Sequence, residues 1–542
     1  MTTDAEGTLQ GGAPKPQAEG FRYPEWLALA ALLIGLTVEI LFYARPLGVS
    51  FPIWAVAVCL AALMIARAES RRPARDSAWL VIPILVLAGL AFVRLEPLTL
   101  FLNVVSVLCL FAVWVRAFRT GRVLDFGWLD FAVSLLWVPL EMVFRPWATL
   151  GQANRRVFGD RATHSRLMAV ARGLLLALPI VVVLALLLTA ADVIFADVLR
   201  EAFEWLDLER LADLARRAVV ILLCAILFLG ALVAALRNPG ERKLIGEDRP
   251  VALPFLGFTE SAVVLVGVNL LFAAFVLVQV RYLFGGQANT TAAGYTYAEY
   301  ARRGFGELVA VAILTLGLIM ALGAFSHRTN SAQRTGFQVL SASLVVLVGV
   351  ILASAFQRLL LYEQAYGFTR LRAYTHVAIV WIGVLFVLFL TLLITGNLRP
   401  FAPAAVGAAI GFALTLSILN VDDFIVRRNA ERWRAGGELD IYYLTSLSED
   451  AIPALAALAG DSPPSVQSEL LPRLACQQAW LDRRDQEGWP ATHLSVLRAR
   501  AALRPWAQVL SGYAVDDEGP RYAWTVERGD GQALGCFYLA YD

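Results

Sequence analysis

Residues 97–115 read P-L-T-L-F-L-N-V-V-S-V-L-C-L-F-A-V-W-V, a stretch of 19 residues without a charged side chain. An α-helix needs about 20 predominantly apolar residues to cross the hydrocarbon core of a bilayer, which is about 30 Å thick. This stretch therefore predicts a transmembrane helix. Further apolar runs of similar length lie at 26–44, 49–66, 78–93, 173–191, 218–236, 261–280, 308–325, 337–355, 376–395 and 404–419. Together the runs predict an all-α polytopic membrane protein with about 11 transmembrane helices.

The composition agrees with this fold class. Of the 542 residues, 58% are hydrophobic and 17% are charged, and the mean hydropathy of +0.64 is too high for a soluble globular protein of this length. The formal net charge is +2, so the chain lacks the overall positive field that nucleic-acid binding needs. Neither the cysteines nor the histidines have metal-ligand spacing, and the phosphate-binding loop and the common hydrolase motifs are absent. The sequence thus predicts no metal, no cofactor, no catalytic residue and no nucleic-acid partner.

Three regions follow from the distribution of polar residues. Residues 1–25 are polar and rich in glycine and proline, which predicts a disordered N-terminal tail, and 26–420 form the transmembrane domain. Residues 126–144 are apolar but interrupted by charges and a proline, and 192–217 have apolar residues at helical spacing; both predict helices lying in the membrane interface. Residues 421–542 predict a polar extramembrane domain with helices at 439–458 and 465–481 and a β-hairpin formed by 522–526 and 533–541.

The basic residues indicate an orientation. More of the loop arginines lie inside when the N-terminus is placed in the cytoplasm, as the positive-inside rule requires, and an acidic segment at 192–213 then lies outside. Eleven spans from that start place the C-terminal domain outside the cytoplasm. Lys15 and Lys243 are the only lysines, a usage typical of GC-rich bacterial genomes, so we expect a bacterial cytoplasmic membrane. Cys476 and Cys536 would then lie where a disulfide can form, although the sequence does not place them within bonding distance.

Several segments resemble a known family. They are T-A-A-D-V-I-F at 189–195, Y-T-Y-A-E-Y-A-R-R-G-F at 295–305, Q-R-L-L-L-Y-E-Q-A-Y-G-F-T-R-L-R at 357–372, L-N-V-D-D at 419–423 and L-D-I-Y-Y-L-T-S-L-S-E-D-A-I-P-A-L at 439–455. From about residue 173 onward the chain is similar to bacterial integral membrane proteins of the domain of unknown function 4173 family, which is close to the 4153 family. The resemblance implies a membrane location and a helical fold, and it brings no activity with it.

Four of these segments, all except 439–455, predict a polar cluster, because the expected topology brings them to the outer ends of spans. The candidate ligand-binding residues are Asp192, Glu299, Arg302, Arg303, Arg358, Tyr362, Arg372, Asn420 and Asp422. Arginine forks bind phosphate and carboxylate groups, so Arg302 and Arg358 would engage an anionic group while Asp192, Glu299 and Asp422 orient them. The alternative is that these residues pair with one another and fix the helix ends.

Two features within the spans also have alternative interpretations. Glu39 has no visible basic partner in the membrane, so it is a candidate for a proton or substrate path or for an interhelical hydrogen bond. Gly407 and Gly411 form a G-x-x-x-G motif, which predicts close helix packing within the chain or in a dimer.

The leading functional hypothesis is a non-enzymatic membrane sensor, scaffold or regulatory partner. Its outer loops and C-terminal domain would bind lipid, in particular an anionic lipid, or another membrane or extracytoplasmic protein, because a polar domain after the last span is typical of an interaction module. One alternative is a transporter of a small solute, which would predict internal repeats that we do not find. A second alternative is a membrane transferase that acts on a lipid-linked phosphate through the arginine and acid cluster.

Overall fold

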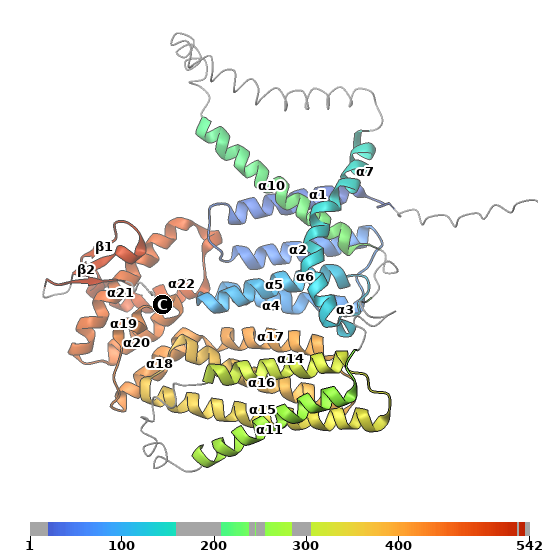
Figure 1. Cartoon of the computed structure of the whole chain (residues 1–542). Coiled ribbons are helices and arrows are strands. Elements are labelled where there is room, and N and C mark those ends of the chain that lie inside the picture. The colour runs from blue at the N-terminus through green and yellow to red at the C-terminus, as the bar shows by residue number, and fades with distance from the viewer. Residues whose placement is uncertain are drawn as a thin grey trace, which may run out of the picture.

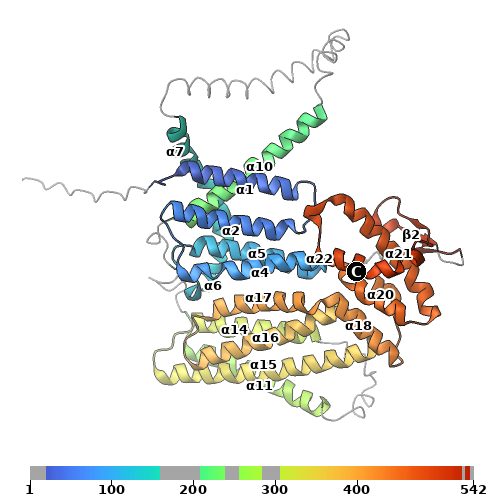
Figure 2. The ribbon, with the colours of Figure 1, turned by 180° about the vertical axis from the view of Figure 1, so that it is seen from behind.

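The computed structural model describes residues 20–158, 208–237, 244, 255–283, 305–527 and 531–536. Within these residues, 10 helices are long and apolar enough to cross a membrane. The eleventh expected span, 173–191, lies outside the described residues, as does the tail up to residue 19. The fold is therefore an all-α polytopic membrane fold, as predicted, and a polar domain covers one end of its helix bundle (Figure 1, Figure 2).

The first half of the bundle contains α1 (Pro24–Phe42), α2 (Ser50–Ala68), α3 (Arg75–Ala78), α4 (Val81–Val93), α5 (Pro97–Ala117), α6 (Trp128–Phe144), α7 (Pro146–Phe158) and α10 (Leu208–Ala235). Apolar residues of α1, α2, α4, α5, α6 and α10 form one continuous core. Two glycines let helices approach closely: a Cβ on Gly35 would lie 2.4 Å from the Ile221 carbonyl oxygen, and one on Gly230 would lie 2.1 Å from that of Met142. These close contacts hold α10 against α1 and α6.

The two expected interfacial segments have different outcomes. Helix α6 runs across its neighbours in Figure 1 rather than along them, and its interfacial position stays a prediction. Residues 192–207 lie outside the described residues, whereas from residue 208 the chain is one unbroken helix through Ala235. Residue 217 is therefore not a helix boundary. Arg217, in the middle of α10, donates to Glu39 of α1 at 2.9 Å, so the basic partner that the sequence did not reveal comes from a helix far along the chain.

The second half of the bundle contains α11 (Phe258–Leu283), α14 (Phe305–Phe325), α15 (Ser331–Tyr366), α16 (Arg370–Ile394) and α17 (Phe401–Leu419), and α11, α14, α15 and α16 share most of its core. Helix α17 joins the halves: Asn103 of α5 donates to Ser417 at 3.0 Å. A Cβ on Gly411 would lie 2.0 Å from the Trp381 ring, so this glycine of the G-x-x-x-G motif packs within the chain.

The C-terminal domain is mostly helical and ends in a small antiparallel sheet. Its helices are α18 (Val421–Arg434), α19 (Ile441–Thr445), α20 (Ile452–Asp461), α21 (Pro464–Arg484), α22 (Leu494–Leu503) and α23 (Ala507–Leu510). The sheet has the order β1 (Val515–Asp516), β2 (Thr525–Glu527), β3 (Ala533–Gly535), with β2 pairing antiparallel to β3. The expected helix at 439–458 is divided into α19 and α20 by a 3₁₀ turn at Glu449–Ala451.

A disulfide joins Cys476 of α21 to Cys536 just after β3, with a Cα–Cα distance of 5.6 Å. The bond answers the question that the sequence left open, because it shows that the fold brings the two cysteines together. Trp524 and Val526 of the sheet are buried beside the bond, so the sheet is fixed to α21 by both covalent and apolar contacts.

Candidate functional site

The C-terminal domain is docked against the bundle end where α1 ends and α2 begins. The Val49 backbone donates to the Thr492 carbonyl at 2.9 Å, and His493 Nε2 contacts the Leu47 carbonyl oxygen at 2.5 Å. A Cβ on Gly48 would lie 2.4 Å from the Ala491 carbonyl carbon, so only glycine fits at this approach. The two parts are therefore in direct backbone contact rather than joined by a linker.

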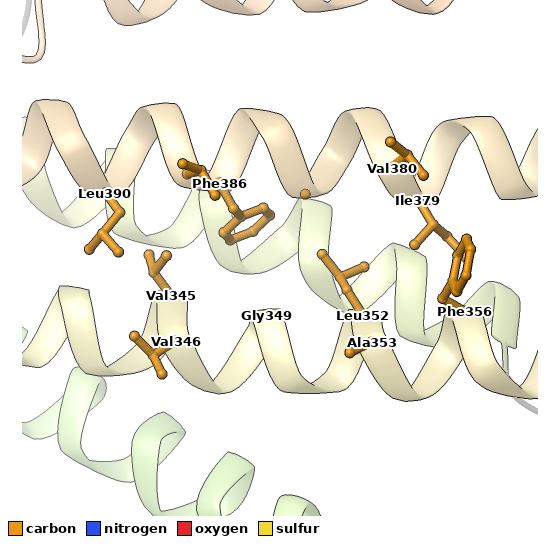
Figure 3. A pocket seen from close by; sticks show the side chains of 12 residues that line it. Val345, Val346, Gly349, Leu352, Ala353, Phe356, Ile379, Val380, Phe386 and Leu390 are labelled. Carbon is orange, nitrogen blue, oxygen red and sulfur yellow. The ribbon is translucent and has the colours of Figure 1, made fainter.

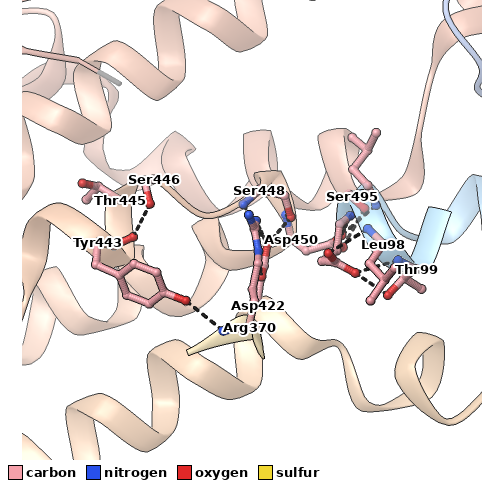
Figure 4. A network of polar contacts seen from close by, with 12 residues as sticks. Leu98, Thr99, Arg370, Asp422, Tyr443, Thr445, Ser446, Ser448, Asp450 and Ser495 are labelled. Carbon is pink, nitrogen blue, oxygen red and sulfur yellow. Dashed lines mark hydrogen bonds and ion pairs between the residues drawn. The ribbon is translucent and has the colours of Figure 1, made fainter. Parts of the chain in front are cut away.

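Asp422 is the centre of the first polar cluster at this junction (Figure 4). Its carboxylate is fully buried and accepts two bonds from the Arg370 guanidinium, at 2.8 and 2.6 Å. It also accepts bonds from the backbone and hydroxyl of Ser448, at 2.8 and 2.6 Å. Arg370 begins α16, Asp422 lies in the first turn of α18, and Ser448 precedes the 3₁₀ turn, so one carboxylate holds three segments together.

Asp450 connects the same domain to the start of α5. Its carboxylate accepts bonds from the backbone amides of Leu95 and Glu96, at 2.7 and 3.0 Å, and from the Ser495 hydroxyl at 2.7 Å. Burial raises the pKa of the Asp450 carboxyl, while the bonds from Ser495 and Leu95 and the charge of Arg94 oppose that increase. The carboxyl thus serves as a well-bonded acceptor between the bundle and the domain.

The candidate residues predicted from the sequence do not form one cluster within the described part of the chain. Asp192, Glu299, Arg302 and Arg303 lie outside the described residues. Asp422 pairs with Arg370, which is not among the candidate residues, and it does not contact Arg358, which was expected to be oriented by it.

Arg358, Tyr362 and Arg372 have contacts of their own, whereas the Asn420 Oδ1 is buried without a hydrogen-bond partner among the described residues. Arg358 is buried in the bundle and donates to Gln279 of α11 at 2.7 Å. Arg372 lies 4.1 Å from the centre of the Tyr362 ring. Asn420 adopts the left-handed conformation (φ 54°) between α17 and α18. These residues position helices and turns at the bundle end.

A second polar cluster lies between α15 and α16, and it is incomplete. Glu363 Oε1 and His376 Nδ1 are 2.9 Å apart. The glutamate is 1% exposed, and its Oε2 and the imidazole Nε2 are buried without a hydrogen-bond partner among the described residues. A buried polar atom without a partner is costly, so such an atom at a cavity is a candidate ligand contact.

Glu363 and His376 line a cavity of about 400 Å³ at the junction. Its walls come from α15, α16, the end of α17 and α18 of the C-terminal domain, and they include Leu360, Gln364, Ala373, Phe424 and Arg428. The cavity is thus apolar on most sides, with a carboxylate and an imidazole on one wall and a guanidinium on another. Within the described ranges, no group of three histidine, cysteine or acidic residues is arranged to hold a metal ion.

The sequence did not reveal this pair, because its histidines were considered only as metal ligands, which would need a characteristic spacing. Glu363 and His376 are 13 residues apart, on two antiparallel helices joined by a short turn in which Gly367 has φ +78°. The usable signal is the tight helix–helix turn, which makes α15 and α16 antiparallel neighbours, so polar residues one or two helical turns before and after it can meet.

These features define a polytopic helical membrane protein with a polar C-terminal domain fixed to one end of its bundle. The chain belongs to the family described as "Domain of unknown function (DUF4153)", whose sequence model matches residues 81–458. The match is to the 4153 family that the sequence analysis named as the neighbour of 4173, and it extends from the start of α4 into α20. Comparisons with curated proteins and with solved structures found no match.

Proposed function

We propose that this protein is a non-enzymatic sensor in a bacterial cytoplasmic membrane, in which a ligand bound at the junction cavity changes the state of the C-terminal domain. The observation that carries the proposal is the cavity itself. Bundle helices α15 and α16 supply a buried carboxylate oxygen and an imidazole nitrogen that have no hydrogen-bond partner within the described ranges, and α18 of the C-terminal domain supplies another wall. A ligand there would contact both parts of the protein.

The contacts around the cavity support a coupling between ligand and domain. Asn429 of α18 accepts a bond from the Phe368 backbone amide at 3.0 Å and donates to the Phe368 carbonyl at 2.9 Å. Phe368 lies in the turn between α15 and α16, so the side chain of one α18 residue holds the turn that positions the cavity wall. A shift of that turn would be transmitted directly to α18.

The disulfide and the arginine distribution support an extracytoplasmic C-terminal domain and a cytoplasmic N-terminus. Disulfides persist outside the reducing cytosol, and the domain contains one between Cys476 and Cys536. The sensed ligand would then come from the outer leaflet or the extracytoplasmic side, and the partner that reads the state would be a membrane or extracytoplasmic protein. Cysteine labelling in intact cells at Ser70 and Gly437 tests this: Gly437 alone should be labelled, and labelling of Ser70 alone would invert the orientation.

Hydrogen exchange tests the coupling. The purified protein would be compared in detergent without phospholipid and in vesicles of phosphatidylethanolamine and phosphatidylglycerol in equal parts. We expect amide exchange in α18 to slow several-fold in vesicles, because a filled cavity fixes the α15–α16 turn. Asn429→Ala should bind the same lipid while its α18 no longer responds. Equal α18 exchange in both environments, with lipid bound, would refute the sensor.

One observation favours an enzyme as a second candidate. A carboxylate on one imidazole nitrogen, with the other nitrogen unpartnered at a cavity, is the arrangement of a general base. His376 would then accept a proton from a hydroxyl group at the membrane surface, as the transferase alternative requires. Lipid mass spectrometry of vesicles incubated with the protein tests this. A new lipid product that is absent with His376→Gln would support the enzyme, and an unchanged lipid profile would exclude it for the lipids supplied.

A further inference from the structure

An apolar groove of about 550 Å³ runs between α15 and α16 (Figure 3). Its floor is formed by buried side chains, including Val345, Leu352 and Phe386. Its rim is open, because Val346 and Val387 are 56% and 65% exposed. In a membrane-spanning helix pair, such a groove is accessible from the lipid.

Two glycines create the hollow. A Cβ built on Gly349 of α15 or on Gly383 of α16 would have no atom within 4 Å. Glycine destabilises a helix interior, and here neither glycine permits a close backbone contact. What the two residues provide is empty space facing the groove, which side chains of ordinary size would fill.

The groove adjoins the cavity that contains the Glu363–His376 pair. Phe356 lines both hollows, and the centre of its ring is 4.6 Å from that of His376. The groove and the cavity therefore meet at Phe356, and the cavity is lined by Arg428 and by Glu363, whose buried Oε2 has no hydrogen-bond partner in the described part of the chain. The apolar groove is thus followed by a cavity with charged groups, as the acyl chain of an amphipathic lipid is followed by its head group.

We infer that the groove and the cavity together bind one glycerophospholipid with an ammonium head group, its acyl chain in the groove, its ammonium at Glu363 and its phosphate toward Arg428. This inference rests on the proposed sensor and names its ligand. The length fits: Val345 to Phe356 spans about 16 Å of α15, close to one leaflet of a hydrocarbon core of about 30 Å.

The charges select the head group. An ammonium supplies several hydrogen-bond donors, and a buried Glu363 Oε2 without a partner needs one. A head group without an amine, such as that of phosphatidylglycerol, offers this oxygen only neutral hydroxyl donors and no positive charge. Arg428 is available to a phosphate because its ion pair with Glu431 joins two exposed side chains, and such pairs exchange easily. The predicted preference for anionic lipids is thus replaced by a preference for a zwitterionic one.

Lipid retention tests the inference. The protein would be purified from vesicles of phosphatidylethanolamine and phosphatidylglycerol in equal parts, and the retained lipid would be identified by native mass spectrometry. We expect phosphatidylethanolamine to be retained over phosphatidylglycerol by about tenfold, the ratio that one charge-assisted hydrogen bond provides. Glu363→Gln should retain lipid but lose this preference. Equal retention of the two lipids by the unmodified protein would overturn the inference.

The groove itself is tested by filling it. Gly349→Leu combined with Gly383→Leu should abolish lipid retention. The matched control is Gly267→Leu with Gly317→Leu, because these glycines of α11 and α14 also have open space around an added Cβ but lie outside the groove. If the Leu pair does not fold, Gly349→Ala, which favours the helix, should lower retention partially. Wild-type retention in a folded groove variant would overturn the inference.

A third outcome is that the protein forms a dimer without phospholipid, and that the dimer is lost in the variant with Gly349→Leu and Gly383→Leu. This result would show that a second copy of the chain occupies the groove, and it would overturn the inferred lipid site. The two proposals fail separately. Phosphatidylethanolamine retained without a response in α18 refutes the sensor and leaves the lipid site, whereas an α18 response to phosphatidylglycerol alone refutes the lipid assignment and leaves the sensor.

Discussion

Asp422 and Glu363 are two carboxylates at the same end of the bundle, and both are almost completely buried. Asp422 accepts four hydrogen bonds, two from Arg370 and two from Ser448. Glu363 has His376 on one oxygen, and its other oxygen has no hydrogen-bond partner among the described residues. A carboxylate whose bonds are complete within the chain stabilises the fold, whereas one whose bonds are incomplete beside a cavity is available to a ligand.

The largest effect is expected for Asp422→Asn. The substitution leaves the Arg370 guanidinium without its charge partner, and breaking a buried pair in this way costs about 3–5 kcal/mol. The free energy of unfolding in detergent, followed by denaturant titration, measures the loss. Asp423→Asn is the matched control, because the neighbouring carboxylate pairs with an arginine that is 67% exposed, and it should cost about 0.3–0.5 kcal/mol. Similar losses for both variants would contradict a structural role for the Asp422 cluster.

A smaller loss is expected when one bond of a complete cluster is removed. Ser495→Ala deletes a donor to Asp450 and should cost about 1–3 kcal/mol, because the carboxylate is buried. Amide exchange in α22 and at Leu95 should increase together, since the bond joins these segments. Ser511→Ala, whose exposed hydroxyl donates only to a nearby carbonyl, should leave exchange unchanged. An equal response to the two substitutions would show that Asp450 does not depend on Ser495.

The junction should weaken as the pH falls. Burial lowers the pKa of His493 below its ordinary value of 6.5, although the carbonyl of Leu47 opposes this. The unfolded state therefore binds more protons than the folded state below pH 6.5, and stability decreases from that pH downward by at most about 1.4 kcal/mol per pH unit. Unfolding of the C-terminal domain at a series of pH values measures the slope. His493→Gln should flatten it, and an unchanged slope in that variant would assign the effect to other groups.

Of the four predictions, the smallest effect on stability is expected for Glu363→Gln, and this variant distinguishes the Glu363 carboxylate from the Asp422 carboxylate most directly. The substitution removes a buried charge that has one bond, so the free energy of unfolding without lipid should change by less than about 1 kcal/mol. The same denaturant titration measures it. A decrease in the free energy of unfolding as large as that of Asp422→Asn would show that the Glu363–His376 pair stabilises the fold and is not a ligand-binding site.

The sequence predicted the spans because each depends only on local hydrophobicity. It could not predict pairings between distant elements: Glu39 meets Arg217 178 residues later, and Asp422 meets Arg370 rather than Arg358. In both cases the partner depends on which helices are neighbours, and apolar periodicity does not encode that.

Three of the five segments that resembled a family, 357–372, 419–423 and 439–455, converge at the junction, whereas 189–195 and nearly all of 295–305 lie outside the described residues. Glu363 and Arg370 come from the segment at 357–372, Asp422 from 419–423, and Ser448 and Asp450 from 439–455. The sequence therefore indicated where the polar residues gather. It did not indicate which of them complete each other's hydrogen bonds and which leave an atom unsatisfied, because that depends on angles and distances between helices.

The corner at Asn420 has a mechanical consequence. Helix α17 ends at Leu419 and α18 begins at Val421, so a single left-handed residue separates a membrane-spanning helix from the first helix of the C-terminal domain. Asn420 is the only residue between the two helices, so no longer linker could change conformation when α17 rotates. The 14 residues of α18 are about 21 Å long, so turning α17 by about 5° would move the far end of α18 by up to about 2 Å. A small rotation of α17 about its axis would thus become a lateral displacement of the far end of α18.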